Sequence, residues 1–197
     1  MTEGIEPLTL RGSSVQLEPM TLEHVDALAR VGLEPELWRW VSTPITSVET
    51  MRNYVSNALD EKRRGVSVPF VIMSKPAAQV IGSTRYANIE MAHRRLEIGW
   101  TWLTSSHQRT RANTECKFLL LTHAFETLKV NRVEFRTDVL NEKSRRAIRR
   151  IGATEEGIAR CHVITDSGRI RDTVYFSIIS SEWPAVRAKL SGLLEGK

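Results

Sequence analysis

Apolar and polar residues alternate along several short stretches of the chain. The clearest stretch runs from residue 96 to residue 103, where Leu, Ile or Trp stands at every second position and Glu97 lies between two of them. A period of two places successive side chains on opposite faces of a β-strand. The pattern predicts a strand with one apolar face and a second, different face that carries Glu97. Val15 and Leu17 indicate a first strand in the same way.

Other stretches repeat their apolar residues every three to four positions, which is the period of an α-helix. Thr21 and Ser47 are typical N-cap residues, and Gly65 and Gly152 are typical of the residue just after a helix. Pro35 opens a short separate segment. The pattern predicts helices at residues 21–31, 46–64, 113–128, 141–152 and 183–194.

Apolar runs between these helices predict strands at residues 68–73, 80–89, 96–103, 132–139, 159–165 and 170–179. The last two flank an Asp-Ser-Gly turn, which is typical of a hairpin. The segment 96–139 is a strand–helix–strand crossover, which pairs parallel strands. We therefore predict an α/β (α+β) fold with a mixed sheet. Because no linker or repeat divides the chain, we predict a single domain over residues 1–197.

The composition excludes several classes of protein. Of the 197 residues 41% are apolar and 26% charged, and no window approaches the roughly 18 apolar residues that a membrane helix needs. Residues 1–7 lack the apolar run of a secretory signal. Cys116 and Cys161 form neither a disulfide framework nor a metal motif. We therefore expect a cytoplasmic protein that has no membrane partner.

The formal net charge of +5 has two interpretations. It can be an ordinary arginine-rich surface, or it can serve an acidic partner. Much of the excess lies at residues 94–95, 109–111 and 143–150, close to the predicted junctions between loops and helices. This clustering favours a phosphate-bearing ligand over a general nucleic-acid surface, and we do not expect nucleic acid as a partner.

The loop before the helix at residue 113 is the first candidate site. A helix start presents several unpaired backbone N–H groups and the positive end of the helix dipole, which together suit phosphate. Arg109 and Arg111 add charge at the same place. The alternative is an exposed basic connector that ends in an Asn cap, because the glycines usual in a phosphate loop are absent.

Asn141, Ser144 and Glu97 are the other polar candidates. The spacing of Asn141 and Ser144 is that of a helix cap, and both side chains could equally face a cleft beside the sheet. Glu97 either pairs with a nearby arginine on a solvated strand face or acts as a general base in a cleft. The tryptophans fit core packing or the wall of a pocket. The histidines lack the spacing of metal ligands, so we expect no metal.

Taken in order and spacing, several short motifs resemble the GCN5-related N-acetyltransferase (GNAT) superfamily. Within it they are most similar to the branch that acetylates the N-terminal alanine or serine of ribosomal proteins. The similarity runs from about residue 8 to residue 190. It implies a mixed and mostly antiparallel central sheet flanked by helices, with a splay between the two central parallel strands. The motifs are Ile81–Ser83, Leu96–Trp100, Gln108–Lys117, Asn141–Ser144, Ile151–Gly157 and Arg171-Asp172.

The resemblance implies that the chain binds acetyl-CoA. The sequence departs from the family pattern where Arg111 and Asn113 replace small residues of the phosphate loop. We expect Arg111 to keep an ordinary backbone conformation, with its side chain turned outward. Ile148 stands where many members have a proton-donating Tyr, and we assign that role to Ser144. The implied cofactor residues are Trp102, Leu103 and Thr104 for pantetheine, Gln108, Arg109, Thr110, Arg111, Ala112, Asn113 and Thr114 for pyrophosphate, and Asn141 and Ser144 for the pantetheine arm and the sulfur.

The implied activity is direct transfer of acetyl to a primary amine, with Glu97 as the base. The acceptor is a protein N-terminus or a small-molecule amine, and the sequence leaves open whether the chain forms a homodimer. Two alternatives remain at this point: a non-catalytic acyl-CoA-binding module, and a nucleic-acid-binding protein that uses the arginines at residues 145–150. The residues that we assign to the acceptor side are Trp38, Trp40, Arg85 and Trp100.

Overall fold

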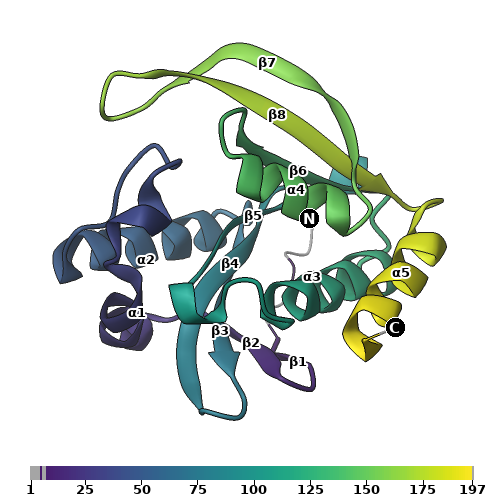
Figure 1. The fold of residues 1–197 in the computed structure, drawn as a ribbon, viewed down its shortest axis with the longest axis horizontal. Helices are drawn as coiled ribbons and strands as arrows, with labels where there is room; N and C mark the ends of the chain where they lie inside the picture. The colour runs from purple at the N-terminus through teal and green to yellow at the C-terminus, as the bar shows by residue number, and fades with distance from the viewer. Residues whose placement is uncertain (1–4, 6–7, 197) are drawn as a thin grey trace.

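The protein folds around one twisted sheet with helices on both of its faces (Figure 1). The structure is a computed structural model that describes Ile5 and residues 8–196. The other residues of the N-terminal stretch that was examined for a secretory signal lie outside this range, as does Lys197.

The strands of the described residues form a single eight-stranded sheet in the order β1-β2-β3-β4-β5-β6-β8-β7. All neighbours are antiparallel except β5 and β6, which are parallel. This confirms the predicted mixed α/β fold. The strands are β1 (Leu10–Arg11), β2 (Val15–Pro19), β3 (Val68–Ser74), β4 (Gln79–Glu90), β5 (Arg95–Leu103), β6 (Arg132–Asp138), β7 (Thr154–Ile164) and β8 (Ile170–Ile179).

Two of the helices, α2 and α4, begin where the sequence places capping side chains. Ser47 Oγ accepts the backbone N–H of Thr50 at 3.1 Å, and Asn141 Oδ1 accepts that of Ser144 at 3.0 Å. These bonds satisfy N–H groups that the first turn of a helix leaves without partners. The helices are α1 (Val25–Gly32), α2 (Val48–Arg63), α3 (Ala112–Thr122), α4 (Glu142–Arg150) and α5 (Trp183–Glu195), with short 3₁₀ turns at η1 (Leu22–His24), η2 (Pro35–Trp38), η3 (Met91–His93) and η4 (Ser105–His107) and a π-helical end of α3 at η5 (His123–Thr127).

Two hydrophobic cores lie on the two faces of the sheet. On one face α3, α4 and α5 pack against most of the strands, with Leu96, Phe135 and Leu120 near the centre of this core. On the other face α1 and α2 pack against β3, β4 and the end of β5, with Met51 and Trp102 between them. The second pair of helices therefore covers only part of its face and leaves β6 and β8 without a helix on that side.

The β7–β8 hairpin is longer than the sequence pattern predicts. β7 begins at Thr154 rather than near Ala159, and its first residues are exposed at the edge of the sheet, where no apolar alternation is needed. Figure 1 shows the hairpin curving so that its turn comes close to the segment between α1 and α2. There the backbone N–H of Asp166 donates to the Ser42 carbonyl oxygen at 3.1 Å.

No helix in the described part of the chain is both long enough and apolar enough to cross a bilayer.

Candidate active site

The two central parallel strands separate almost as soon as they have paired. β5 and β6 share only three residue pairs, and the last of these joins Glu97 to Glu134. Beyond this point β5 continues to pair with β4 and β6 with β8, so the two strands run apart. The facing edges of residues 98–103 and 135–138 consequently keep backbone groups that pair with no strand. This is the splay that the sequence resemblance implied.

An irregularity in β5 lies at the start of this splay. The register between β4 and β5 shifts between Ser83 and Arg85, and Trp100 has a positive φ of 49°. An extra residue in one strand of an antiparallel pair is a β-bulge, which turns the strand and redirects its backbone groups. The bulge therefore directs the end of β5 away from β6.

The loop from β5 to α3 lies at the open end of the splay. Gln108 Nε2 donates to the Leu103 carbonyl oxygen at 2.8 Å, and its Oε1 accepts from Lys143 of α4. Arg150 of α4 donates to Thr114 Oγ1 at 2.5 Å. The start of α3 is therefore surrounded by cations from α4 as well as from its own loop.

The backbone of this loop agrees with the expectation for Arg111. Arg111 has a φ of −67°, in the ordinary helical region, and its side chain reaches the end of α5 near Gly196. The strained position is Arg109 instead, with a φ of 60°. Thr110 Oγ1 accepts the N–H of Ala112 at 3.2 Å. α3 begins at Ala112, with Arg111 at the N-cap position and no side-chain cap, so Asn113 lies in the first turn and is not the cap that the alternative interpretation expected.

Asn141 and Ser144 form a helix cap, which is one of the two interpretations that the sequence allowed. The cap uses Oδ1 of Asn141 and leaves its Nδ2 group for other partners. Ser144 is half-buried in the first turn of α4, and Ile148, one turn later, is buried. Both polar side chains stand next to the end of β6, at the border of the splay.

Glu97 is buried at the base of the splay, on the face that faces away from α3. Its Oε2 accepts from Asn88 Nδ2 and from Arg136 Nε, each at 2.7 Å. Its Oε1 has no hydrogen-bond donor among the described residues and lies next to Gly99, where a Cβ atom would be only 2.9 Å away. One carboxylate oxygen is therefore anchored while the other remains available beside the bulge.

The four residues assigned to the acceptor side have different surroundings. Trp38 is part of the second core and donates from Nε1 to the Gly32 carbonyl oxygen at 2.6 Å. Trp40 is half-buried. Arg85 is buried, pairs with Glu61 at 2.8 Å, and lies 4.7 Å from the ring centre of the exposed Trp100. Arg85 and Trp100 therefore lie against each other, whereas Trp38 is a packing residue of the second core.

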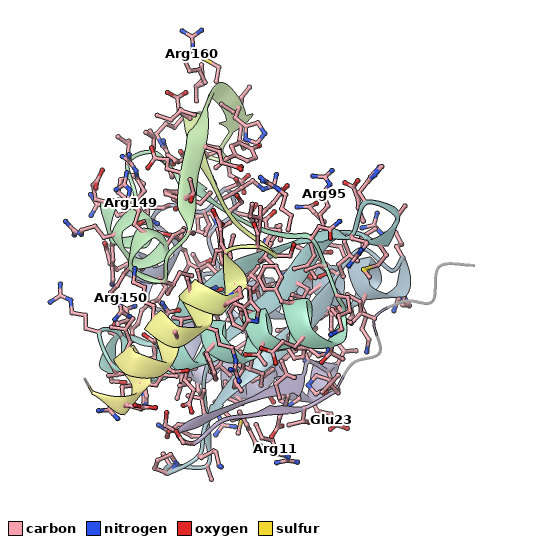
Figure 2. All side chains as sticks on the ribbon, turned by 90° about the vertical axis from the view of Figure 1, so that its right-hand side faces the viewer. Arg11, Glu23, Arg95, Arg149, Arg150 and Arg160 are labelled. Atoms are coloured by element: carbon pink, nitrogen blue, oxygen red, sulfur yellow. The ribbon has the colours of Figure 1, made fainter. Side chains whose placement is uncertain are left out.

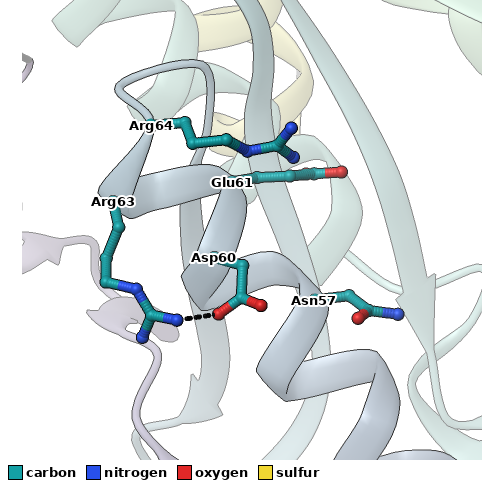
Figure 3. Close-up of a pocket in the computed structure, with 5 residues that line it drawn as sticks. All are labelled: Asn57, Asp60, Glu61, Arg63 and Arg64. Atoms are coloured by element: carbon teal, nitrogen blue, oxygen red, sulfur yellow. Dashed lines mark hydrogen bonds and ion pairs between the residues drawn. The ribbon is translucent and has the colours of Figure 1, made fainter.

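Two hollows adjoin the second half of α2. The first, of about 560 Å³, is lined only by side chains of α2 and its end, and Figure 3 shows Asp60 bonded to Arg63 within it. The second, of about 320 Å³, is lined by Glu61, Arg64, Asn88 and Trp100 among others. Since Asn88 also holds Glu97, the second hollow is the one next to the candidate base.

Lys117 of α3 is a buried cation that the sequence analysis did not single out. Its Nζ donates to Thr101 Oγ1 of β5 at 2.7 Å and lies 5.7 Å from the Phe135 ring of β6, so it bridges the two diverging strands. Burial lowers its pKa from 10.5 to about 8. A sequence signal exists, because Lys117, Leu121 and Ala124 follow the helical period of a buried stripe.

Lys117→Met should increase the free energy of unfolding at pH 7 by about 2 kcal/mol. Because the folded-state pKa lies below the usual value, the unfolded chain binds more protons between pH 8 and pH 10.5. Wild-type stability therefore rises with pH in that window, and the advantage of the variant should shrink there. Urea unfolding at pH 7 and pH 9.5 measures both effects. The exposed Lys189→Met is the control, with an expected change under 0.5 kcal/mol; a pH-independent difference would contradict the prediction.

Among the described residues, no group of three or more His, Cys, Asp or Glu side chains is placed to hold a metal ion.

Comparison with known proteins agrees with this geometry. A family model described as an acetyltransferase (GNAT) domain matches residues 14–154. The uncharacterized N-acetyltransferase p20 of Bacillus licheniformis is 27% identical over 176 residues, which are 89% of this chain and 98% of that protein. A GCN5-related N-acetyltransferase from Brucella melitensis superposes with a TM-score of 0.90 at 29% identity, over 98% of this chain and 87% of that one.

Mycobacterium smegmatis RimJ, determined in complex with CoA-disulfide, superposes with a TM-score of 0.79 at 25% identity, over 97% of this chain and 94% of that one. Because the family model covers more than half of the chain, the protein belongs to the GNAT family of acetyltransferases.

Proposed function

We propose that this protein transfers an acetyl group from acetyl-CoA to a primary amine. The observation that carries the proposal is the early separation of β5 and β6, with the basic start of α3 at its open end. Unpaired strand edges can accept an extended ligand as an added strand would. A helix start with nearby cations suits a diphosphate. The first feature fits the pantetheine arm of coenzyme A and the second fits the diphosphate to which that arm is joined.

The residues that would hold acetyl-CoA follow from this placement. The backbone of Trp102, Leu103 and Thr104 would pair with the pantetheine amides. The loop from Gln108 to Thr114 would hold the pyrophosphate, with Lys143 and Arg150 adding charge. Asn141 would use its free Nδ2 group on the pantetheine arm. The CoA bound in the RimJ structure supports this assignment for a protein of the same fold.

Glu97 would act as the base, because a protonated amine has no lone pair with which to attack. Its unoccupied Oε1 beside Gly99 is the atom that would take the proton. Arg136 and Asn88 would hold the carboxylate in place through Oε2. Backbone N–H groups near Trp102 would stabilise the oxyanion that forms at the thioester carbonyl, and Ser144 would protonate the leaving thiolate.

The acceptor would approach from the Glu97 face of the sheet. The opposite face is filled by the core beneath α3, α4 and α5. On the Glu97 face α1 and α2 stop at the end of β5, and the remaining space would be bordered by Arg85 with Trp100 and by Trp40 beside Arg169. The acceptor would be a protein N-terminus, as the ribosomal-protein branch suggests, or a small-molecule amine.

The nucleic-acid alternative loses support from the surroundings of α4. Arg145 and Arg149 both pair with Glu155, and Arg150 is bonded to Thr114. Figure 2 shows Arg149 and Arg150 on the outer side of the protein. Since two of these arginines are already neutralised by a carboxylate, they offer less net charge to a phosphate backbone.

The proposal predicts free thiol when the protein, acetyl-CoA and a suitable amine are combined. A panel should contain peptides that begin with Ala or Ser together with small amines, and thiol release should be measured against protein-free mixtures. Thermal stabilisation by acetyl-CoA without thiol release from any amine would favour the non-catalytic module instead. No binding of acetyl-CoA in calorimetry would reject both.

The double variant Lys143→Gln, Arg150→Gln should bind CoA about 30-fold more weakly than the wild type. Each lost charge-assisted contact with phosphate removes about 1 kcal/mol at this exposed site. The affinity of the variant should also depend less steeply on salt. Calorimetric titration at two salt concentrations tests this. Arg160→Gln, in the distant hairpin (Figure 2), is the matched control and should bind CoA normally; equal losses in both would show a general charge effect.

A further inference from the structure

A chain of ion pairs runs across the Glu97 face of the sheet, and its charge balance changes along the strands. Where β5 and β6 still pair, three glutamates contact two arginines. At the far end of β6, two arginines share one carboxylate. The first group is Glu90, Glu134 and Glu156 with Arg95 and Arg132, the middle pair is Glu97 with Arg136, and the last group is Asp138 with Arg169 and Arg171.

Arg171 is the cation without a carboxylate of its own. Asp138 is fully buried, and its oxygens already accept from the Leu140 backbone N–H at 2.9 Å and from Arg169. Arg171 Nε lies 3.9 Å from Asp138, which is too far for a hydrogen bond. That Nε is buried and has no hydrogen-bond partner among the described residues.

The local charge therefore exceeds neutrality by one positive unit. Arg136, Arg169 and Arg171 face the carboxylates Glu97 and Asp138. Burial lowers the pKa of Arg171, and Arg169 and Arg136 add to this effect. The Arg171 side chain is half-buried, with 15% of its surface exposed, and an unpaired charge in such surroundings destabilises a protein unless a partner satisfies it. A purely structural network would be expected to close on itself, as the pair of Glu97 and Arg136 does.

We infer that Arg171, with Arg169 beside it, binds a carboxylate of the acceptor, and that the acceptor is a primary amine with a carboxylate a few bonds from its nitrogen. The inference rests on the proposed function, because it places the acceptor on the Glu97 face. The planar guanidinium fork of arginine matches a carboxylate with two parallel hydrogen bonds. An acceptor held in this way presents its amine to Glu97 and its acid group to the end of β6. Polyamines, which carry only positive charge, are repelled by the same residues.

The end of the Glu97 face that carries Arg169 and Arg171 is also enclosed. Asp166 and Ser42 are bonded across the β7–β8 turn and the segment before α2. The Arg169 guanidinium lies 5.8 Å from the ring centre of Trp40. The contact between these two segments places an aromatic wall next to the arginines. Partial exclusion of water strengthens the attraction between a guanidinium and a bound carboxylate.

Matched pairs of acceptors test the inference with the wild-type protein. Alanine is compared with alaninamide, and a peptide that begins Ser-Asp with one that begins Ser-Asn, by thiol release at one pH. In whichever pair the enzyme uses, we expect kcat/KM to be about 10- to 100-fold higher for the acid, meaning the compound that carries the additional carboxylate. Preference within the first pair identifies a free amino acid, and preference within the second an acidic peptide. Equal values within both pairs would overturn the inference.

Variants separate recognition from a structural role. Arg171→Gln should lower kcat/KM about 10- to 100-fold more for the acid than for the amide and so remove the preference, while Arg171→Lys should keep part of it. Arg160→Gln is the control and should behave as wild type. An equal loss for acid and amide would assign Arg171 to the fold and contradict the inference.

A binding measurement keeps the test independent of turnover. N-acetylalanine should raise the melting temperature of the wild type more than N-acetylalaninamide does, and Arg171→Gln should abolish the difference. If no amine releases thiol but this difference is present, the proposed function fails and the anion site stands. No difference between the two compounds overturns the anion site.

Discussion

Glu97→Gln should lower the turnover of acetyl transfer about 100-fold and leave the Kd for acetyl-CoA within about threefold. General base catalysis contributes about 10²- to 10⁴-fold, and an amide cannot accept the proton of an ammonium group. Glutamine can keep its oxygen on Arg136 and Asn88, so the surroundings of the site should persist. Thiol release under saturating acetyl-CoA and calorimetric titration with acetyl-CoA in the absence of an amine measure the two quantities separately.

Glu134→Gln is the matched control for this variant. Glu134 lies opposite Glu97 in the parallel ladder, and it is also held by arginines, Arg95 and Arg132. The proposal gives it no part in proton transfer. Its turnover should stay within about threefold of wild type. Similar losses in both variants would indicate an effect of the charge network on the fold, and normal turnover in Glu97→Gln would remove Glu97 from the mechanism.

Local patterns in the sequence predicted most of the secondary structure because caps and periods are local. The Ser47 and Asn141 caps involve residues three positions apart, and both helices begin where those side chains predict. β1, with two residues, and the first half of β7 were missed. Strand segments at the edge of a sheet expose most of their side chains. Burial therefore does not require apolar and polar residues to alternate along them.

Local patterns could not predict which residues contact one another within the candidate site. Glu97 was singled out because a carboxylate stood in an apolar strand, but its hydrogen bond to Arg136 spans 39 positions in the sequence. That contact depends on how β5, β6 and the splay are arranged, which no local pattern contains. Trp38 and Trp102 show the same limit, since only the packing of α1 and α2 assigns both rings to the core.

The geometry of the splay depends on how closely β5 can approach β4, and one glycine controls this. Gly82 of β4 pairs with Leu103, and a Cβ atom at Gly82 would lie 2.0 Å from the Trp102 carbonyl oxygen. Backbone cannot move aside as the tip of a side chain can. Any other residue at position 82 must therefore push the end of β5 away from β4, toward the gap in which we place the cofactor.

Gly82→Ala should lower the free energy of unfolding by about 3 kcal/mol or more, because the added methyl group breaks the ladder between β4 and β5. The protein that remains folded should also bind CoA more weakly, since the displaced strand narrows the splay. Gly192→Ala is the control: nothing lies within 4 Å of its added Cβ, and alanine in helix α5 should stabilise by about 0.5–1 kcal/mol. Urea unfolding and calorimetry with CoA test both variants. If Gly82→Ala were as stable as the wild type, close contact between these strands would not be what positions the end of β5.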